Sequence, residues 1–152
     1  PILIRNPAAV RPWQHVLECL SGYLCLGERV SREGKDSPVA SAFNFGPDPG
    51  ARQPVRRLVE EVLSGWPGEW IDGSEPGAAH EAKLLTLAID KAAALLGWRP
   101  VWNFEEGIRA TVEWYRRRHA DGDHDAEMEE FSRRQIRDYV AAAGRRGLPW
   151  AE

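Results

Sequence analysis

The clearest structural signal in the sequence is the stretch Trp13-Gln-His-Val-Leu-Glu-Cys-Leu-Ser-Gly-Tyr-Leu-Cys-Leu-Gly-Glu-Arg-Val-Ser-Arg32. Its apolar and small residues recur at steps of three and four, which is the spacing of one helical face. These residues are Val16, Leu20, Tyr23, Leu24 and Gly27. We therefore predict a helix from Trp13 to about Arg32.

The segments on either side of this helix are shorter. Residues 1–4 form an apolar run that predicts a strand, and a turn-rich stretch follows at residues 6–9. Beyond the helix, residues 34–38 break the pattern. Residues 39–45 are typical of a buried strand, and residues 46–50 of a turn.

The middle of the chain alternates between helix and strand signals. Pro54 suits a first helical turn, and the apolar positions after it predict a helix that ends near Gly65. Trp70 and Ile71 indicate a short strand, residues 73–77 a loop, and residues 83–89 a further strand. Asp90 is a good N-cap for a short helix closed by Gly97.

The C-terminal third is expected to be helical. Asn103-Phe-Glu-Glu106 has the form of a capping box, with Ile108, Val112 and Tyr115 as the inner stripe of the helix that follows. After an acidic break at residues 121–125, a last helix is predicted over residues 126–143. The whole is one α/β unit over residues 1–152, mostly helices with a few short strands.

Composition excludes several classes of protein. The 152 residues are 43% hydrophobic and 28% charged, with a formal net charge of −3. This balance does not favour a nucleic-acid-binding surface, and no apolar run is long enough to span a membrane. Cys19 and Cys25 fall on different faces of the first helix, so we expect no disulfide and a reducing, cytoplasmic location.

The acidic cluster Asp121-Gly-Asp123-His-Asp125 has carboxylates at the first, third and fifth positions of a calcium loop. Its sixth position is Ala126 and its twelfth is Ser132, where Gly and Glu are required. His119 and His124, without further ligands, are weak evidence for zinc. We predict no metal site.

Candidates for nucleophilic catalysis are equally few. The chain has no Gly-x-Ser-x-Gly elbow. Cys19 lies one helical turn after His15, which allows a thiol–imidazole pair, although a core cysteine beside a hydrogen-bonded histidine is the commoner case. Neither a dinucleotide fingerprint nor a Walker motif is present, so no cofactor site is expected.

Arg5 and Arg11 lie in the irregular stretch that leads into the first helix. Forked arginine donors beside a helix N-terminus suit a phosphate group, while a surface charge is the simpler interpretation of either residue. Trp13 adjoins Arg11 and could shape a ligand pocket, although core packing is again simpler.

A series of motifs in fixed order carries a family resemblance. Arg11-Pro-Trp-Gln-His-Val16 is the most specific of them, and Leu96-Gly-Trp-Arg-Pro100 is shared more widely. The others are Leu20-Ser-Gly-Tyr-Leu24, Phe43-Asn-Phe-Gly-Pro47, His80-Glu-Ala82, Leu85-Thr-Leu87, Lys91-Ala92, Thr111-Val-Glu-Trp-Tyr115, Arg134-Gln-Ile136 and Tyr139. Over nearly its whole length, the chain resembles the C-terminal part of the CDP-glucose 4,6-dehydratases, lyases among the extended short-chain dehydrogenases/reductases.

The resemblance implies a reaction that this chain is not expected to catalyse alone. Such enzymes use tightly bound NAD to oxidise C4 of CDP-glucose, eliminate water across C5 and C6, and return the hydride to C6. The family's catalytic Tyr-x-x-x-Lys pair and its NAD-binding Rossmann domain belong to the N-terminal portion. Here Tyr23, Tyr115 and Tyr139 have no lysine four residues later. The expectation is therefore a substrate-binding portion that is inactive in isolation.

The resemblance also implies positions for substrate contacts. Arg11 corresponds to the arginine that meets the diphosphate, Asn44 to an amide that contacts the nucleotide, and His80 to a segment that closes over the ribose or phosphate. Ile2 and Leu3 belong to the strand that lies along the base. Trp13 and His15 are interpreted as supports, and Cys19 stands where the family pattern has proline.

Alternatives to this assignment stay open at the level of sequence. The chain could belong to an epimerase or dehydratase of another nucleotide sugar, or be a non-catalytic remnant that holds a ligand. The family commonly forms homodimers through its N-terminal half. An isolated C-terminal portion is expected to expose apolar surface and to aggregate or fold poorly.

Overall fold

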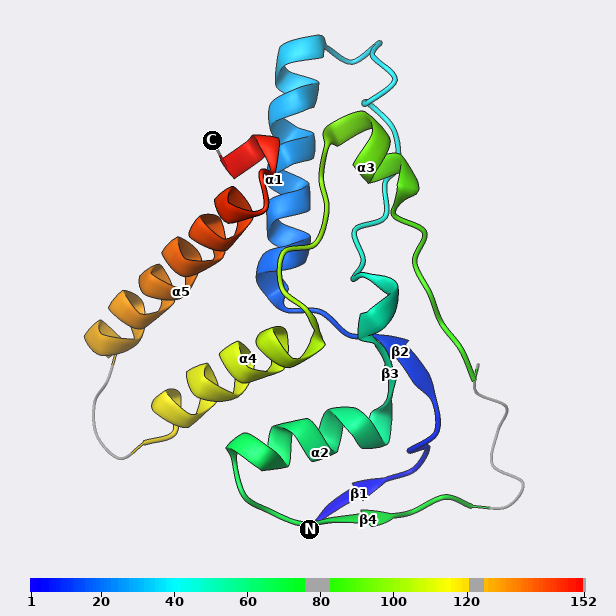
Figure 1. Ribbon diagram of the computed structural model, residues 1–152, viewed down its shortest axis with the longest axis vertical. Helices are drawn as coiled ribbons and strands as arrows, with labels where there is room; N and C mark the ends of the chain where they lie inside the picture. Colours follow the sequence, from blue (N-terminus) through cyan, green and yellow to red (C-terminus); the bar gives the residue numbers. More distant parts are fainter. Residues whose placement is uncertain (76–82, 121–124, 152) are drawn as a thin grey trace.

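The protein is a helix-rich α/β structure (Figure 1). A computed structural model describes residues 1–75, 83–120 and 125–151. The helices in this part of the chain are α1 (Val16–Glu33), α2 (Val55–Gly65), α3 (Asp90–Leu96), α4 (Phe104–Arg118) and α5 (Asp125–Arg145). The strands are β1 (Ile2–Ile4), β2 (Val10–Pro12), β3 (Arg52–Pro54) and β4 (Trp70–Asp72), and single 3₁₀ turns occur at Pro49–Ala51 and Pro149–Ala151.

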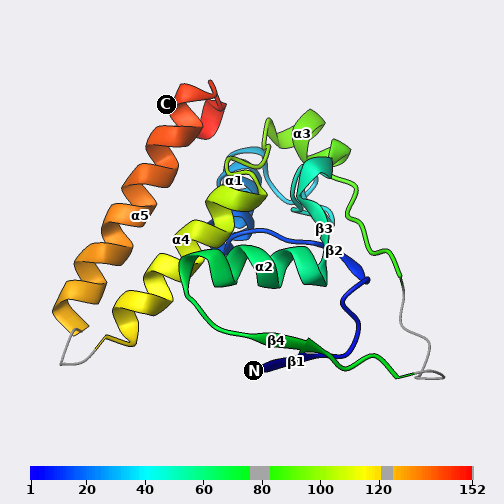
Figure 2. The same ribbon diagram turned by 60° about the horizontal axis from the view of Figure 1, so that its bottom comes forward.

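The four strands form two small sheets. β1 pairs with β4 in parallel, with Leu3 opposite Ile71, and β2 pairs with β3 in antiparallel fashion, with Arg11 opposite Gln53. Figure 2 shows the β1–β4 pair beneath α2, away from the α1 end of the molecule. The predicted strands at residues 1–4 and at Trp70–Ile71 are confirmed.

α1 confirms the long first helix and shows why it begins later than predicted. The side chain of His15 is the N-cap, since its Nδ1 accepts a hydrogen bond of 3.3 Å from the backbone N–H of Leu17. Trp13 and Gln14 thus belong to the loop before the helix. The helix ends before Gly34, whose φ of 86° is a conformation that favours glycine.

Two predicted strands are wrong. Residues 39–45 form no strand, although Val39 and Phe45 are buried, because no strand lies beside them in the described part of the chain. Residues 83–89 contribute only a bridge between Leu84 and Val10. An apolar run predicts burial, but a strand also needs a partner for its backbone hydrogen bonds.

The remaining helices follow their local signals. Asn103 and Glu106 form the predicted capping box at the start of α4. Gly97 closes α3 with a φ of 65°, but Asp90 is the first residue of α3 and Ile89 is its N-cap, so the predicted N-cap is wrong by one residue. Ile108 and Val112 of α4 are buried, whereas Tyr115 is exposed and does not belong to the inner stripe.

A buried polar network joins α1 to the turn after α3 and to α5. The carboxylate of Glu18, only 1% exposed, accepts hydrogen bonds from the backbone N–H groups of Val101 and Trp102 and from the hydroxyl of Tyr139. Ser21 Oγ accepts from the indole N–H of fully buried Trp98. We call this set the Glu18 clamp.

None of the described helices is long and apolar enough to cross a membrane.

Candidate functional site

Strand β2, which carries Arg11, is bordered on both sides. β3 lies along one side, and on the other the N–H of Val10 donates to Lys83 O at 2.9 Å while the N–H of Leu85 donates to Val10 O at 3.2 Å. Figure 1 shows the segment before α3 passing beside β2. Three parts of the chain therefore meet at Arg11.

The Arg11 side chain is half-buried at this junction. Its guanidinium donates to Val10 O at 2.9 Å. The loop after it is fixed because the indole N–H of Trp13 donates to Gln53 O at 2.9 Å in β3. Arg11 thus belongs to a two-stranded sheet shortly before the N-terminus of α1, and not to the irregular stretch that the sequence predicted.

Asn44 is exposed, and its neighbour Phe45 is the anchor of the segment. The Phe45 ring packs edge-on against Trp98 at 5.0 Å between centroids and lies directly over Gly22 of α1. Its carbonyl oxygen accepts a hydrogen bond of 3.0 Å from the side-chain amide of Gln14. Gln14 therefore ties the Asn44 segment to the loop that follows Arg11.

The next residues connect this segment to the chain after position 82. A side chain at Gly46 would begin only 2.7 Å from Cβ of Leu87, so the two backbones approach closely. One continuous region is therefore formed by β2 with the loop after it, by residues 43–47 (the Asn44 segment) and by residues 83–87. We call it the Arg11–Asn44 edge. His80 lies outside the described residues.

Ile2 and Leu3 lie apart from this edge, in β1. They are 48% and 61% exposed, and β1 leads into β2 through the turn at residues 6–9. As consecutive strand residues, they point to opposite faces of the β1–β4 pair. The structure connects β1 to the Arg11–Asn44 edge through a short turn, without bringing Ile2 or Leu3 to Asn44 itself.

Two side chains at the edge were not singled out from the sequence. Gln14 is one of them. Lys91 of α3 is the other: its ammonium group donates to Ser41 Oγ at 2.8 Å and to Ala42 O at 2.9 Å, and lies 4.5 Å from the centroid of Phe43. Both belong to the family motifs, which is the signal that could have marked them.

The supporting role assigned to His15 and Trp13 agrees with their surroundings. Burial lowers the pKa of His15 to about 4, so the imidazole is neutral near pH 7, and its ring packs edge-on against Trp102. Trp13 packs beside Phe104 in the core between α2 and α4.

The cysteines do not have the surroundings of nucleophiles. Burial, followed by the nearby charge of Glu18, raises the pKa of Cys19, and burial raises the pKa of Cys25 to about 11. Cys19 Sγ accepts from the amide of Gln14 at 2.8 Å. Both thiols are free, as predicted. A raised thiol pKa disfavours the reactive thiolate.

No group of three or more potential metal ligands comes together among the described residues. Of the acidic cluster, Asp121, Asp123 and His124 lie outside them, and Asp125 begins α5. A Rossmann site needs a glycine-rich loop between a strand and a helix, and this sequence contains no such motif.

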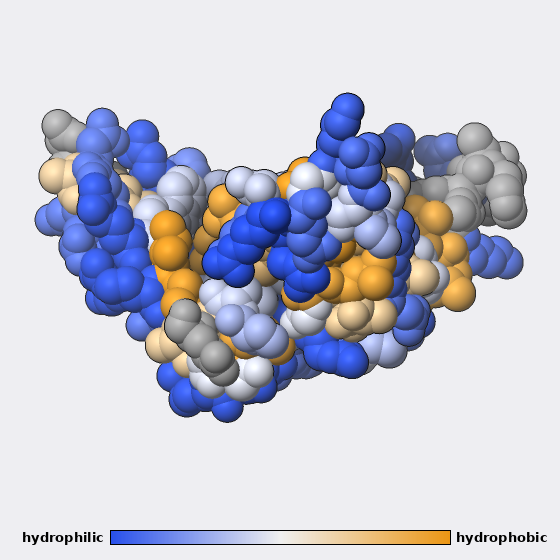
Figure 3. Space-filling view, turned by 90° about the horizontal axis from the view of Figure 1, so that it is seen from above, coloured by the Kyte–Doolittle hydropathy of each residue, from blue (hydrophilic) through white to orange (hydrophobic). Residues whose placement is uncertain are grey.

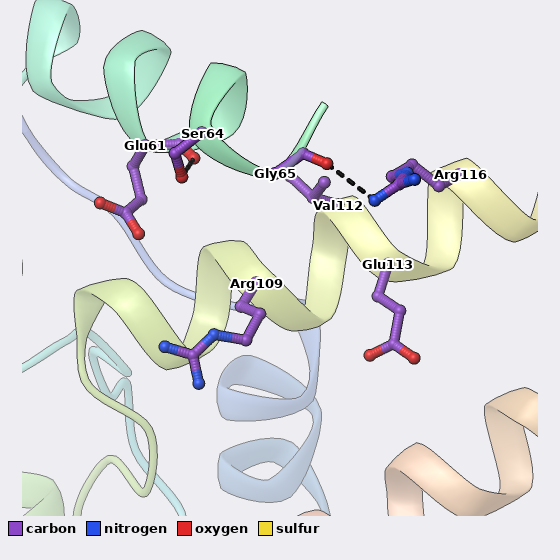
Figure 4. A pocket seen from close by; sticks show the side chains of 7 residues that line it. All are labelled: Glu61, Ser64, Gly65, Arg109, Val112, Glu113 and Arg116. Atoms are coloured by element: carbon purple, nitrogen blue, oxygen red, sulfur yellow. Dashed lines mark hydrogen bonds between the residues drawn. The ribbon is translucent and has the colours of Figure 1, made fainter. Parts of the chain in front are cut away.

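A pocket of about 380 Å³ lies between α2 and α4, away from the Arg11–Asn44 edge (Figure 4). Arg116 donates to Gly65 O at 2.9 Å and so satisfies a carbonyl at the end of α2. Arg109, Glu61 and Glu113 also line the pocket, so its charges are mixed. This arrangement stabilises a helix pair and offers no surplus charge to a ligand.

Two larger hollows run along α1 and share Leu17 and Ile136. One, of about 540 Å³, is bordered by α1, α4 and α5, and the other, of about 470 Å³, lies between α1 and α5. In the space-filling view, apolar side chains gather in the hollow between the arm that holds α5 and the body of the molecule (Figure 3). The lining is mainly apolar, which is typical of a packing surface.

The helix-rich α/β arrangement is the class of structure that the sequence predicted for part of an extended sugar-nucleotide enzyme. No family model matches the chain. The chain is similar to CDP-glucose 4,6-dehydratase from Salmonella typhimurium, with 36% identity over 146 residues. The match covers 95% of this chain and 39% of the relative, which confirms the resemblance and shows that the chain spans about two fifths of that protein's length.

Proposed function

We propose that this chain is the nucleotide-sugar-binding portion of an NAD-dependent CDP-glucose 4,6-dehydratase. The observation that carries the proposal is the identity of 36% along 95% of the chain. The way in which the chain brings the motif around Arg11 and the motif around Asn44 together supports it, since a ligand that spans diphosphate and nucleoside needs both.

The residues at the Arg11–Asn44 edge have distinct proposed roles. Arg11 binds the diphosphate, because its planar donors match a pair of phosphate oxygens. Asn44 hydrogen-bonds the nucleotide, and His80 closes over the ribose or phosphate. Ile2 and Leu3 of β1 contact the base.

The chemical steps are proposed to depend on a second portion of the enzyme. The chain has neither a Tyr-x-x-x-Lys pair nor a dinucleotide loop, so NAD and the acid–base groups would come from residues outside this sequence. The assembled enzyme is proposed to be a homodimer that converts CDP-glucose to CDP-4-keto-6-deoxyglucose and water.

The test uses the complete gene product with NAD and four substrates: CDP-, dTDP-, GDP- and UDP-glucose. The expected result is loss of water from CDP-glucose, which mass spectrometry detects. A clear preference for another nucleotide would instead support an epimerase or dehydratase of that sugar. Turnover by the isolated 152-residue chain would overturn the assignment of catalysis to a second portion.

Arg11→Leu tests the proposed contact between Arg11 and the diphosphate. We expect KM for CDP-glucose to rise at least tenfold, because charge-assisted hydrogen bonds to phosphate are lost, each about 1.5 to 3 kcal/mol. Arg99→Leu is the control, since Arg99 is exposed in the turn after α3. Equal KM values for the two variants would remove Arg11 from the proposed site.

A further inference from the structure

Gln14 holds the Asn44 segment through a single side-chain hydrogen bond to the backbone. Its amide nitrogen donates to Phe45 O at 3.0 Å, one residue beyond Asn44. We infer that Gln14 is a positioning residue for nucleotide-sugar recognition, which acts by fixing the backbone at Asn44. This inference rests on the proposed function and assigns Gln14 no contact with the ligand.

The anchor at Phe45 makes such a role effective. Its ring is held on three sides, by the bare backbone of Gly22, by Trp98 at 5.0 Å and by Tyr23 at 5.6 Å between centroids. This packing restrains the ring, so the main freedom that remains is the orientation of the adjoining peptide. The hydrogen bond from Gln14 removes it.

Gln14 also lies in the loop that follows Arg11. Trp13, its neighbour, is fixed to β3 through Gln53 O. One short path that sets the distance between Arg11 and Asn44 therefore runs through the fixed loop, the Gln14 amide and the Phe45 carbonyl. A diphosphate-linked nucleoside requires both ends of its site at a fixed separation, because small displacements weaken binding.

The surroundings of Gln14 do not suit a residue that serves stability alone. Its Oε1 is buried and finds no hydrogen-bond partner in the part of the chain that the structure describes. A buried, unsatisfied carbonyl oxygen opposes the gain from the Nε2 hydrogen bonds. Removing the amide should therefore change stability little while it loosens the Asn44 segment.

Two variants of the complete gene product test this role. Gln14→Met keeps the length of the side chain and removes the donor. We expect KM and Kd for CDP-glucose to rise about threefold to tenfold, the equivalent of one hydrogen bond, with kcat and the melting temperature nearly unchanged.

Gln14→Glu gives a readout that a structural role would not produce. The ionised carboxylate cannot donate to Phe45 O, whereas the protonated acid can. Relative to wild type, the binding of CDP-glucose should therefore be weak at about pH 8. It should recover as the pH is lowered towards about 5, because burial at this position raises the pKa of the introduced carboxyl. A constant ratio to wild type across this range would overturn the inference.

Gln135→Met is the matched control. Gln135 of α5 donates its side-chain amide to Ala110 O of α4 at 2.8 Å, the same kind of bond without contact to residues 43–47. We expect it to lower stability and leave KM unchanged. Equal KM for Gln14→Met and wild type rejects the positioning role alone, whereas failure of the wild-type protein to bind CDP-glucose rejects the proposed function.

Discussion

Tyr139 of α5 donates a hydrogen bond of 2.8 Å to Oε2 of Glu18 in α1, although 121 residues separate them. The same carboxylate accepts from the N–H groups of Val101 and Trp102, at 2.9 and 2.8 Å. Burial raises the pKa of Glu18, while the two backbone hydrogen bonds and the one from Tyr139 act to lower it. The carboxylate is tolerated in the core because donors surround it.

Glu18→Gln tests how far the fold depends on this arrangement. The introduced amide presents an NH₂ group where one carboxylate oxygen now accepts, so at least one backbone N–H loses its partner. We expect the free energy of unfolding to fall by about 1 to 3 kcal/mol, measured by urea denaturation.

Glu28→Gln is the control for that experiment. Glu28 lies on the exposed side of α1 and forms an ion pair of 2.7 Å with Arg32. Exposed pairs of this kind contribute little, about 0 to 1 kcal/mol. Equal losses in the two variants would contradict a specific role for the buried carboxylate.

Gly22 and Gly27 of α1 provide a matched pair for packing at Phe45. A Cβ at Gly22 would overlap the Phe45 ring, whereas nothing lies within 4 Å of a Cβ at Gly27. We expect Gly22→Ala to destabilise by about 1 to 3 kcal/mol and Gly27→Ala to stabilise by about 0.5 to 1 kcal/mol. Thermal unfolding measures both, and stabilisation by Gly22→Ala would show that the ring can move.

His15 predicts a dependence of stability on pH. Its pKa is 6.5 in an unfolded chain and about 4 in the folded protein, so between these values the unfolded state binds the extra proton. Stability is therefore lost as the pH falls through this window, by up to about 3 kcal/mol.

His15→Asn isolates that contribution. Asparagine keeps an N-cap acceptor for the N–H of Leu17 but does not titrate. The variant is expected to be less stable near pH 7, since the ring contact with Trp102 is lost, and to lose less stability than wild type on acidification. Parallel stability curves between about pH 7 and pH 4 would contradict the assignment to His15.

The apolar face along α1 and α5 predicts the behaviour of the 152-residue chain alone. Leu20, Leu24, Ile136 and Val140 are exposed, Leu24 by 75%. We expect this chain to self-associate, and the double variant Leu24→Lys/Val140→Lys to remain monomeric in sedimentation experiments. Ser31→Lys, on the polar part of α1, controls for added charge. A wild-type monomer with a sharp two-state melt would contradict this expectation.

Local signals account for the features that the sequence predicted correctly. The capping box at Asn103 and the glycine stop at Gly97 depend on residues within one turn, so they could be read without knowledge of the fold. For residues 39–45 and 83–89, the predicted strands rest on apolar content alone. Strand pairing depends on neighbours distant in sequence, which such runs do not reveal.

The candidate site likewise has residues that the sequence indicates and contacts that it does not. Arg11 was identified from its place before a helix, and the family motifs indicated Asn44. The link between them through Gln14 and Phe45 O had no local signal, because it depends on the packing of Phe45 against α1. Glu18 was equally inconspicuous, since its partners lie more than 80 residues away.

The Glu18 clamp also sets an order of events during synthesis on the ribosome. Glu18 emerges before its two backbone donors at Val101 and Trp102, and the hydroxyl of Tyr139 follows after them. A nascent chain that stops before α5 holds an acidic side chain that lacks one of its three donors. Completion of this part of the core must therefore wait for α5, which supplies Tyr139 and Ala143.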